Sequence, residues 1–90
     1  MHYAYLLACA DGTYYAGYTT EPRRRVAEHN DGAGAKYTRG RTPVELVHVE
    51  RFESRSAAMS REYELKQLSH GEKAHLAAET DVERVLGGVE

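Results

Sequence analysis

The fold is decided by residues 2–19, which read HYAYLLACADGTYYAGYT. The stretches rich in Tyr and Leu on either side of Asp11-Gly12 are typical of two β-strands, and Asp-Gly between them is a strong hairpin signal. Propensity favours a two-residue turn at Asp11-Gly12, and a three-residue loop that includes Ala10 is the alternative. Gly17 in the middle of the second strand indicates a bulge or a close approach of another group to the backbone.

The rest of the chain predicts one more strand and several helices. The strand is expected at residues 44–52; the helices are expected from Pro22 to about Asn30, from Ser54 or Ser56 to about Leu68, and onward from Ser69, with one helical turn at residues 35–39. Ser69 and Glu72 have the spacing of a capping box. The sequence therefore predicts an α/β fold, a small three-stranded antiparallel sheet flanked by helices in the order β-β-α-(α)-β-α-α.

Length and composition limit the kind of protein that the chain can be. Ninety residues allow one domain, which we expect at residues 1–79, with the acidic residues 80–90 as a frayed tail. Cys9 is the one cysteine, which excludes an internal disulfide. No run approaches the roughly 18 apolar residues of a membrane span, and the N-terminus lacks the pattern of a signal peptide, so we expect a cytoplasmic protein.

The net charge of -2 conceals a gradient along the chain. Residues 22–44 hold six cations against two acids, whereas residues 45–90 hold ten acids against six cations. The cations of the basic segment are Arg23, Arg24, Arg25, Lys36, Arg39 and Arg41. Such a block marks an anion-binding face in one interpretation, and it is a solvated charge cluster in the other.

Arg25 and His29 are four residues apart, so both project from one face of the helix that Pro22 begins. An arginine grips a phosphate with two parallel donors. A histidine one turn away can shuttle a proton or orient a hydroxyl. The alternative is an exposed pair that serves no site.

Glu62 falls among apolar residues on its helix. The inward stripe is expected to hold Ala58, position 61 or 62, Leu65 and Leu68, and Met59 lies three residues before Glu62. Burial of an unpaired carboxylate there would cost roughly several kcal/mol. Either a buried arginine or tyrosine hydroxyl pairs with it, or it points into a site and holds a hard cation such as Mg²⁺.

The residues singled out above also match a known pattern. Tyr3-Ala4-Tyr5 and Tyr15-Ala16-Gly17 form its two half-motifs; Gly17-Tyr18-Thr19, Pro22, Arg24-Arg25, His29-Asn30, Gly32, the segment from Lys36 to Arg39, and Arg61-Glu62-Tyr63 followed by Lys66-Gln67-Leu68 continue it. In this combination the chain resembles the GIY-YIG nuclease superfamily, in its small single-domain (UPF0213-like) branch. The resemblance extends from residue 2 to about residue 79.

The resemblance implies a role for each candidate residue. Glu62 would hold one Mg²⁺ or Mn²⁺ ion, and Arg25 would grip a phosphate oxygen as negative charge builds. Tyr5 and Tyr15 would position the attacking water, with Tyr5 as the favoured base and His29 as its proton partner. Contacts with the phosphate backbone would come from Arg23, Arg24, Lys36, Arg39 and Arg41.

The function expected from this resemblance is that of a metal-dependent endo- or exonuclease. It would hydrolyse DNA phosphodiester bonds, with RNA as the alternative substrate, and would be directed to ends or branched structures in DNA repair or processing. Two other functions compete: a nucleic-acid-binding module without catalysis, and a protein-interaction domain whose tyrosines only pack. The nuclease would be favoured if one groove brought together the five residues with proposed catalytic or metal-binding roles: Tyr5, Tyr15, Arg25, His29 and Glu62.

This hypothesis makes a demand on the hairpin. A two-residue turn would put Tyr5 opposite Tyr18, and Tyr15 would then lie on the other face of the sheet. A three-residue loop, with Gly12 at positive φ, puts Tyr5 opposite Gly17 and keeps Tyr15 on the face of Tyr5. We therefore predict the three-residue loop.

Overall fold

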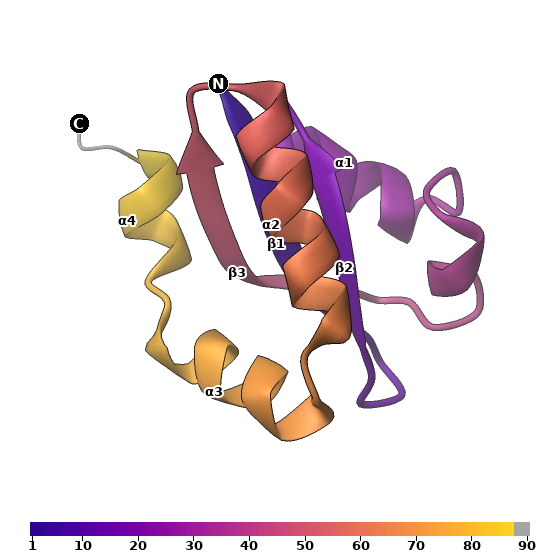
Figure 1. The fold of residues 1–90 in the computed structure, drawn as a ribbon. Helices are drawn as coiled ribbons and strands as arrows, with labels where there is room; N and C mark the ends of the chain where they lie inside the picture. Colours follow the sequence, from indigo (N-terminus) through magenta and orange to yellow (C-terminus); the bar gives the residue numbers. More distant parts are fainter. Residues whose placement is uncertain (88–90) are drawn as a thin grey trace.

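The computed structural model describes residues 1–87 and contains one sheet surrounded by helices (Figure 1). Its elements are β1 (His2–Ala8), β2 (Tyr14–Thr19), α1 (Pro22–Asn30), the 3-10 helix η1 (Lys36–Thr38), β3 (Glu45–Phe52), α2 (Arg55–Gln67), α3 (His70–Glu79) and α4 (Val82–Gly87). The three strands are antiparallel in the order β2-β1-β3. The predicted α/β fold is confirmed, and its first strand is central in the sheet.

The loop between β1 and β2 has the predicted three residues. Cys9 N donates to Thr13 O at 2.8 Å, and Gly12 N donates to Cys9 O at 3.0 Å. Gly12 has a φ of 89°, a left-handed conformation that suits glycine. The two-residue turn favoured by propensity is therefore absent from this hairpin.

The register that follows from this loop puts the candidate tyrosines on one face. Tyr5 lies opposite Gly17, and Tyr15 lies opposite Leu7. Side chains two residues apart on a strand share a face, so Tyr5 and Tyr15 project to the same side of the sheet.

Each face of the sheet has its own apolar core. On one face Tyr5, Leu7, Cys9, Val44 and Val49 pack with Val26 of α1 and with Val82, Val85 and Leu86 of α4. On the other face Ala4, Leu6 and Ala16 pack with Leu65 of α2, with Leu68 directly after it, and with Leu76 of α3. Figure 1 shows α2 lying along the sheet. Helices α1 and α2 therefore reach the sheet from opposite sides.

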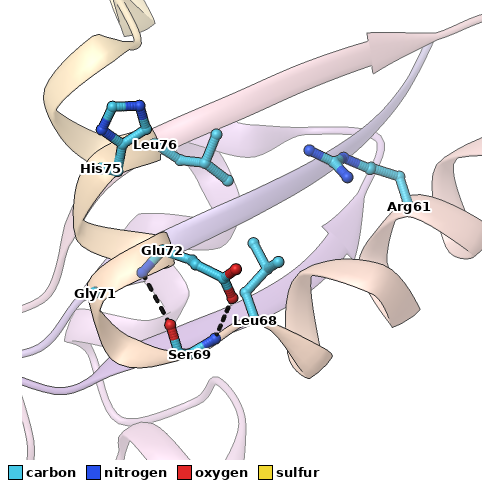
Figure 2. Close-up of a pocket in the computed structure, with 7 residues that line it drawn as sticks. All are labelled: Arg61, Leu68, Ser69, Gly71, Glu72, His75 and Leu76. Atoms are coloured by element: carbon cyan, nitrogen blue, oxygen red, sulfur yellow. Dashed lines mark hydrogen bonds between the residues drawn. The ribbon is translucent and has the colours of Figure 1, made fainter.

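The predicted caps of the two long helices are confirmed. Ser54 Oγ accepts from Ala57 N at 3.1 Å at the start of α2. At the start of α3, Ser69 Oγ accepts from Glu72 N at 3.1 Å, and a Glu72 carboxylate oxygen accepts from Ser69 N at 2.8 Å (Figure 2). The reciprocal pair satisfies amides that the first turn of a helix leaves without backbone partners.

The expectation of a frayed tail over residues 80–90 is wrong for most of that segment. Residues Val82–Gly87 form α4, and Val82, Val85 and Leu86 pack against the core. Three apolar side chains on one face of a short helix outweigh the acidic character of the segment. Residues 88–90 lie outside the described part of the chain. Among residues 1–87, no helix is long and apolar enough to cross a membrane.

Candidate active site

Tyr5 occupies the middle of the central strand, and its ring lies across the neighbouring strand. The residue is 2% exposed. A Cβ atom built on Gly17 would lie 2.4 Å from the Tyr5 hydroxyl, so only a glycine leaves room for the ring in this position. The close approach to the backbone that was expected at Gly17 is therefore the packing of the Tyr5 ring against it.

His29, in the last turn of α1, is fully buried and forms a chain of hydrogen bonds with Tyr5 and Thr38. Its Nε2 lies 3.2 Å from the Tyr5 hydroxyl, and its Nδ1 lies 2.8 Å from Thr38 Oγ1. Thr38 donates its own proton to Ala35 O at 2.9 Å. Nδ1 must therefore carry the proton that Thr38 accepts, which leaves Nε2 as the acceptor for the Tyr5 hydroxyl.

The electrostatics of this pair keep both groups neutral at pH 7. Burial raises the pKa of Tyr5 to about 12, with the Tyr15 hydroxyl adding to the increase and the Arg25 guanidinium opposing it. Burial, followed by the positive charge of Arg25, lowers the pKa of His29 below its usual 6.5. Arg25 alone therefore does not make Tyr5 a base at neutral pH.

Tyr15 and Arg25 lie beside this pair. The Tyr15 ring centroid is 6.5 Å from that of Tyr5 and 5.3 Å from that of His29. Arg25 is half-buried, and its Nη1 donates to Glu28 Oε1 at 2.9 Å. The two tyrosines, the arginine and the histidine predicted from sequence thus come together at one place.

Glu62 lies on α2, so it approaches Tyr5 from the opposite face of the sheet, past the edge strand β2. Its side chain is 16% exposed, and Lys66 Nζ lies 3.4 Å from its Oε2. The carboxylate is one of the charges that raise the pKa of Tyr5, so it lies within electrostatic range of that hydroxyl. Ala58 and Leu65 are buried on the same helix as predicted, whereas Met59 is 40% exposed and is not an apolar neighbour in the core.

The donor at Glu62 suits a hard cation. A carboxylate oxygen is a ligand that Mg²⁺ and Mn²⁺ accept. Within residues 1–87, no group of three or more His, Cys, Asp and Glu side chains comes together as a metal site. A cation at Glu62 would therefore have at most two such side chains of the described chain as ligands, with water or substrate oxygens completing its coordination.

The basic residues predicted to contact phosphates have diverse surroundings. Arg23 pairs with Glu83 of α4 at 2.7 Å and borders a hollow with Val82, away from the tyrosines. Arg24 is exposed beside Glu28. Arg41 donates to Asp11 at 2.6 Å and lies 4.3 Å above the Tyr37 ring. The other two, Lys36 and Arg39, are exposed on η1 and directly after it.

Two residues important to the geometry were not singled out from the sequence. Thr38 Oγ1 accepts the hydrogen bond from His29 Nδ1. A Cβ atom on Gly34 would lie 2.4 Å from His29 Nδ1 and 2.7 Å from its Cα, so Gly34 does for His29 what Gly17 does for Tyr5. The available signal was the spacing of Thr38 within the segment from Lys36 to Arg39, but only the folded chain shows which side chain it meets.

Comparison with known proteins identifies the family of this site. Residues 1–74 match the GIY-YIG catalytic domain. The chain belongs to the GIY-YIG family. Membership indicates nuclease chemistry and a nucleic acid substrate in general terms.

GIY-YIG relatives of similar length are UPF0213 proteins. One from Natronomonas pharaonis is 67% identical over 78 residues, which cover 87% of this chain and 92% of the relative. One from Halobacterium salinarum is 64% identical over 76 residues, covering 84% of this chain and 99% of the relative. The solution structure of a UPF0213 protein from Bacillus halodurans is 51% identical with a TM-score of 0.53, covering 86% of this chain and 82% of that one.

Proposed function

We propose that this protein is a divalent-cation-dependent nuclease that hydrolyses phosphodiester bonds in DNA. The observation that carries the proposal is the buried hydrogen-bonded chain from Tyr5 through His29 to Thr38, beside Arg25. A tyrosine that serves packing alone also needs a hydrogen-bond partner for its buried hydroxyl, but here that partner is a neutral histidine beside the Arg25 guanidinium, a combination suited to proton transfer next to a phosphate. The cellular setting that we propose is DNA repair or processing, at ends or branched structures.

The proton path follows from the hydrogen bonds. A tyrosine with a pKa of about 12 is a poor base in isolation. His29 Nε2 is an unprotonated acceptor at 3.2 Å, so Tyr5 can take a proton from water as it passes its own to His29. Thr38 keeps the imidazole in the tautomer that this transfer needs.

The remaining roles follow from charge and position. Arg25 would hold a non-bridging phosphate oxygen with N–H donors other than the one that it gives to Glu28. Tyr15 would orient the attacking water beside Tyr5. A cation held by Glu62 would supply charge neutralisation at the phosphate and at the leaving oxygen.

The test is cleavage of fluorescent single-stranded, duplex, flap and junction DNAs, with RNA counterparts, in Mg²⁺ or Mn²⁺. We expect the wild-type protein to cut at least one DNA and Glu62→Gln to lose at least about 100-fold in rate. Glu64→Gln is the matched control on the same helix, since Glu64 is 63% exposed and pairs with Arg61. It should cut normally.

Two outcomes would contradict the proposal. If Glu62→Gln cuts as fast as the wild type while remaining folded, Glu62 does not hold the cation. If the wild-type protein binds DNA but cuts none of these substrates in either cation, it is a binding module without catalysis.

A further inference from the structure

A hollow of about 280 Å³ opens beside the candidate active site, along the exposed edge of β2. It is lined by Tyr14, Tyr15, Ala16, Tyr37, Lys66 and Lys73, and we call it the edge hollow. Tyr15 belongs both to this hollow and to the group around His29. The edge hollow and the group around His29 are therefore adjacent.

The fold brings the two lysines of the edge hollow from a part of the chain with net negative charge. Lys66 is in the last turn of α2 and Lys73 is in α3. The start of α3 lies against β2, since the ring centroids of His70 and Tyr14 are 5.1 Å apart (Figure 1). Sequence segments that look acidic on average thus place two cations next to the tyrosines.

Lys73 lacks the acidic partner that most of the site's basic neighbours have. Arg25, Arg41 and Lys66 each have a carboxylate partner. Lys73 is half-buried and has no carboxylate partner among residues 1–87. A half-buried ammonium beside aromatic rings, without a counter-charge, is suited to an anionic ligand.

A different hollow, of about 530 Å³, lies between α2 and α3 (Figure 2). Its lining includes Leu68, Leu76 and the capping residues Ser69 and Glu72, and it holds none of the residues placed at the candidate active site. Its basic side chains, Arg61 and His75, already contact carboxylates of Glu50, Glu64 and Glu79, and Glu72 adds negative charge. The edge hollow is therefore the better match for a phosphate-bearing ligand.

We propose that the nucleic acid strand passes over the edge hollow, where Lys73 binds a backbone phosphate next to the scissile one. This proposal rests on the proposed nuclease function and adds to it the path of the strand. Lys66 shares the same phosphate region, and the rings of Tyr14 and Tyr37 contact the sugar and base of that nucleotide. The volume, close to the lower limit of about 300 Å³ for small-ligand pockets, suits one nucleotide.

Lys73 is the residue on which to test the proposal, because Lys66 also contacts Glu62. The variant Lys73→Gln removes one charge without breaking an ion pair. Arg84→Gln is its matched control, since Arg84 is exposed on α4 and has no carboxylate partner among the described residues. Binding of fluorescein-labelled DNA is measured in EDTA, so that no cleavage occurs, over a series of salt concentrations.

We expect Lys73→Gln to weaken binding and to lower the slope of log K against log salt by about 0.7 for a single strand or about 0.9 for a duplex. Lys73→Arg should restore both, and Arg84→Gln should match the wild type. A neutral methylphosphonate placed at single positions next to the cleavage site should weaken wild-type binding at one position. At that position it should have no further effect on Lys73→Gln.

Each failure has its own signature. If wild-type protein neither binds nor cuts DNA, the nuclease function is wrong and the strand path fails with it. If the wild type cuts and Glu62→Gln does not, but Lys73→Gln binds as well as Arg84→Gln, the strand path alone is wrong. Methylphosphonate effects that are equal in the wild type and Lys73→Gln would also overturn it.

Discussion

His29 and His48 each form a hydrogen bond through Nδ1 to a threonine hydroxyl. Each of these hydroxyls in turn donates a hydrogen bond to a backbone carbonyl. What differs is the group at Nε2. At His29 it is the Tyr5 hydroxyl, which can donate, so the ring is neutral. At His48 it is the Glu50 carboxylate at 2.7 Å, which can only accept, so Nε2 donates to it. The same bond to a threonine thus accompanies an accepting Nε2 at His29 and a donating Nε2 at His48.

The state of His29 predicts the acid limb of the pH profile. Burial lowers the pKa of His29 below 6.5, so the neutral acceptor predominates above that lowered pKa and is lost as the pH falls through it. We expect the acid limb of kcat/KM for DNA cleavage to be centred below pH 6.5. The measurement is the initial rate at subsaturating DNA over a pH series. A limb centred above pH 6.5 would contradict the role of neutral His29.

The fit of Tyr5 on Gly17 predicts a large effect from one methyl group. In Gly17→Ala the new carbon would lie 2.4 Å from the Tyr5 hydroxyl, so the ring must shift from the position in which its hydroxyl meets His29 Nε2. We expect the cleavage rate to fall about 100-fold and the free energy of unfolding to fall by about 1–3 kcal/mol. Gly71→Ala is the control, because nothing lies within 4 Å of its added Cβ. Equal rates for the two variants would separate Tyr5 from catalysis.

At the scale of elements, Glu50 joins β3 to α2 and to the corner between α3 and α4. It accepts from His48 at 2.7 Å and from Arg61 of α2 at 2.9 Å, while His48 also contacts Thr80 after α3. The helices on this face therefore share one charged contact as well as an apolar core. The His48 bond, followed by those from Arg61, lowers the pKa of the Glu50 carboxyl below 4.5.

This network predicts how stability depends on pH. A carboxyl whose pKa is lower in the folded state stabilises the fold above its unfolded pKa, and that stability is lost as the pH falls through the folded pKa. Urea unfolding should show Glu50→Gln less stable than the wild type by about 1–3 kcal/mol at pH 7. The difference should narrow below pH 4.5. A difference that does not change with pH would mean that the carboxylate charge has no part in it.

At the scale of the whole molecule, α4 closes the face of the sheet that carries Tyr5. Leu86 is half-buried against that core. We expect Leu86→Ala to lower the free energy of unfolding by about 1–2 kcal/mol, below the range for a fully buried leucine. Arg84→Ala, on the exposed side of the same helix, should change it by less than about 0.5 kcal/mol. If both variants are as stable as the wild type in urea, α4 contributes no packing to the fold.

Most of the parts of this fold that were predictable depend on local rules. The capping box at Ser69 and the inward stripe with Leu65 followed from helical spacing, and each involves residues close in sequence. The length of the hairpin loop did not follow from local rules, since propensity favoured a two-residue turn. It followed from the demand that Tyr5 and Tyr15 share a face, and strand geometry then placed Gly17 opposite Tyr5.

The parts that were not predictable depend on encounters between distant residues. Arg23 meets Glu83, 60 positions away, and Arg41 meets Asp11, 30 positions away. Composition alone counted both arginines with the basic face, because it does not show which acids the fold brings near them. The helix α4 was missed for the same reason: its apolar side chains gain their value only from a core that is assembled elsewhere.

The central position of β1 has a consequence for the order in which the ribosome delivers this protein. The first 38 residues already contain Tyr5, Tyr15, Arg25, His29 and Thr38, and the hairpin and α1 lie wholly within them. The other edge of β1 stays open until Phe52 has been synthesised, because β3 is its partner there. Glu62 follows ten residues later still, on the helix that contributes the buried Leu65 to the second core. A nascent chain therefore holds most of the proposed catalytic side chains before it holds the cation ligand, and cutting would begin only when the sheet is complete.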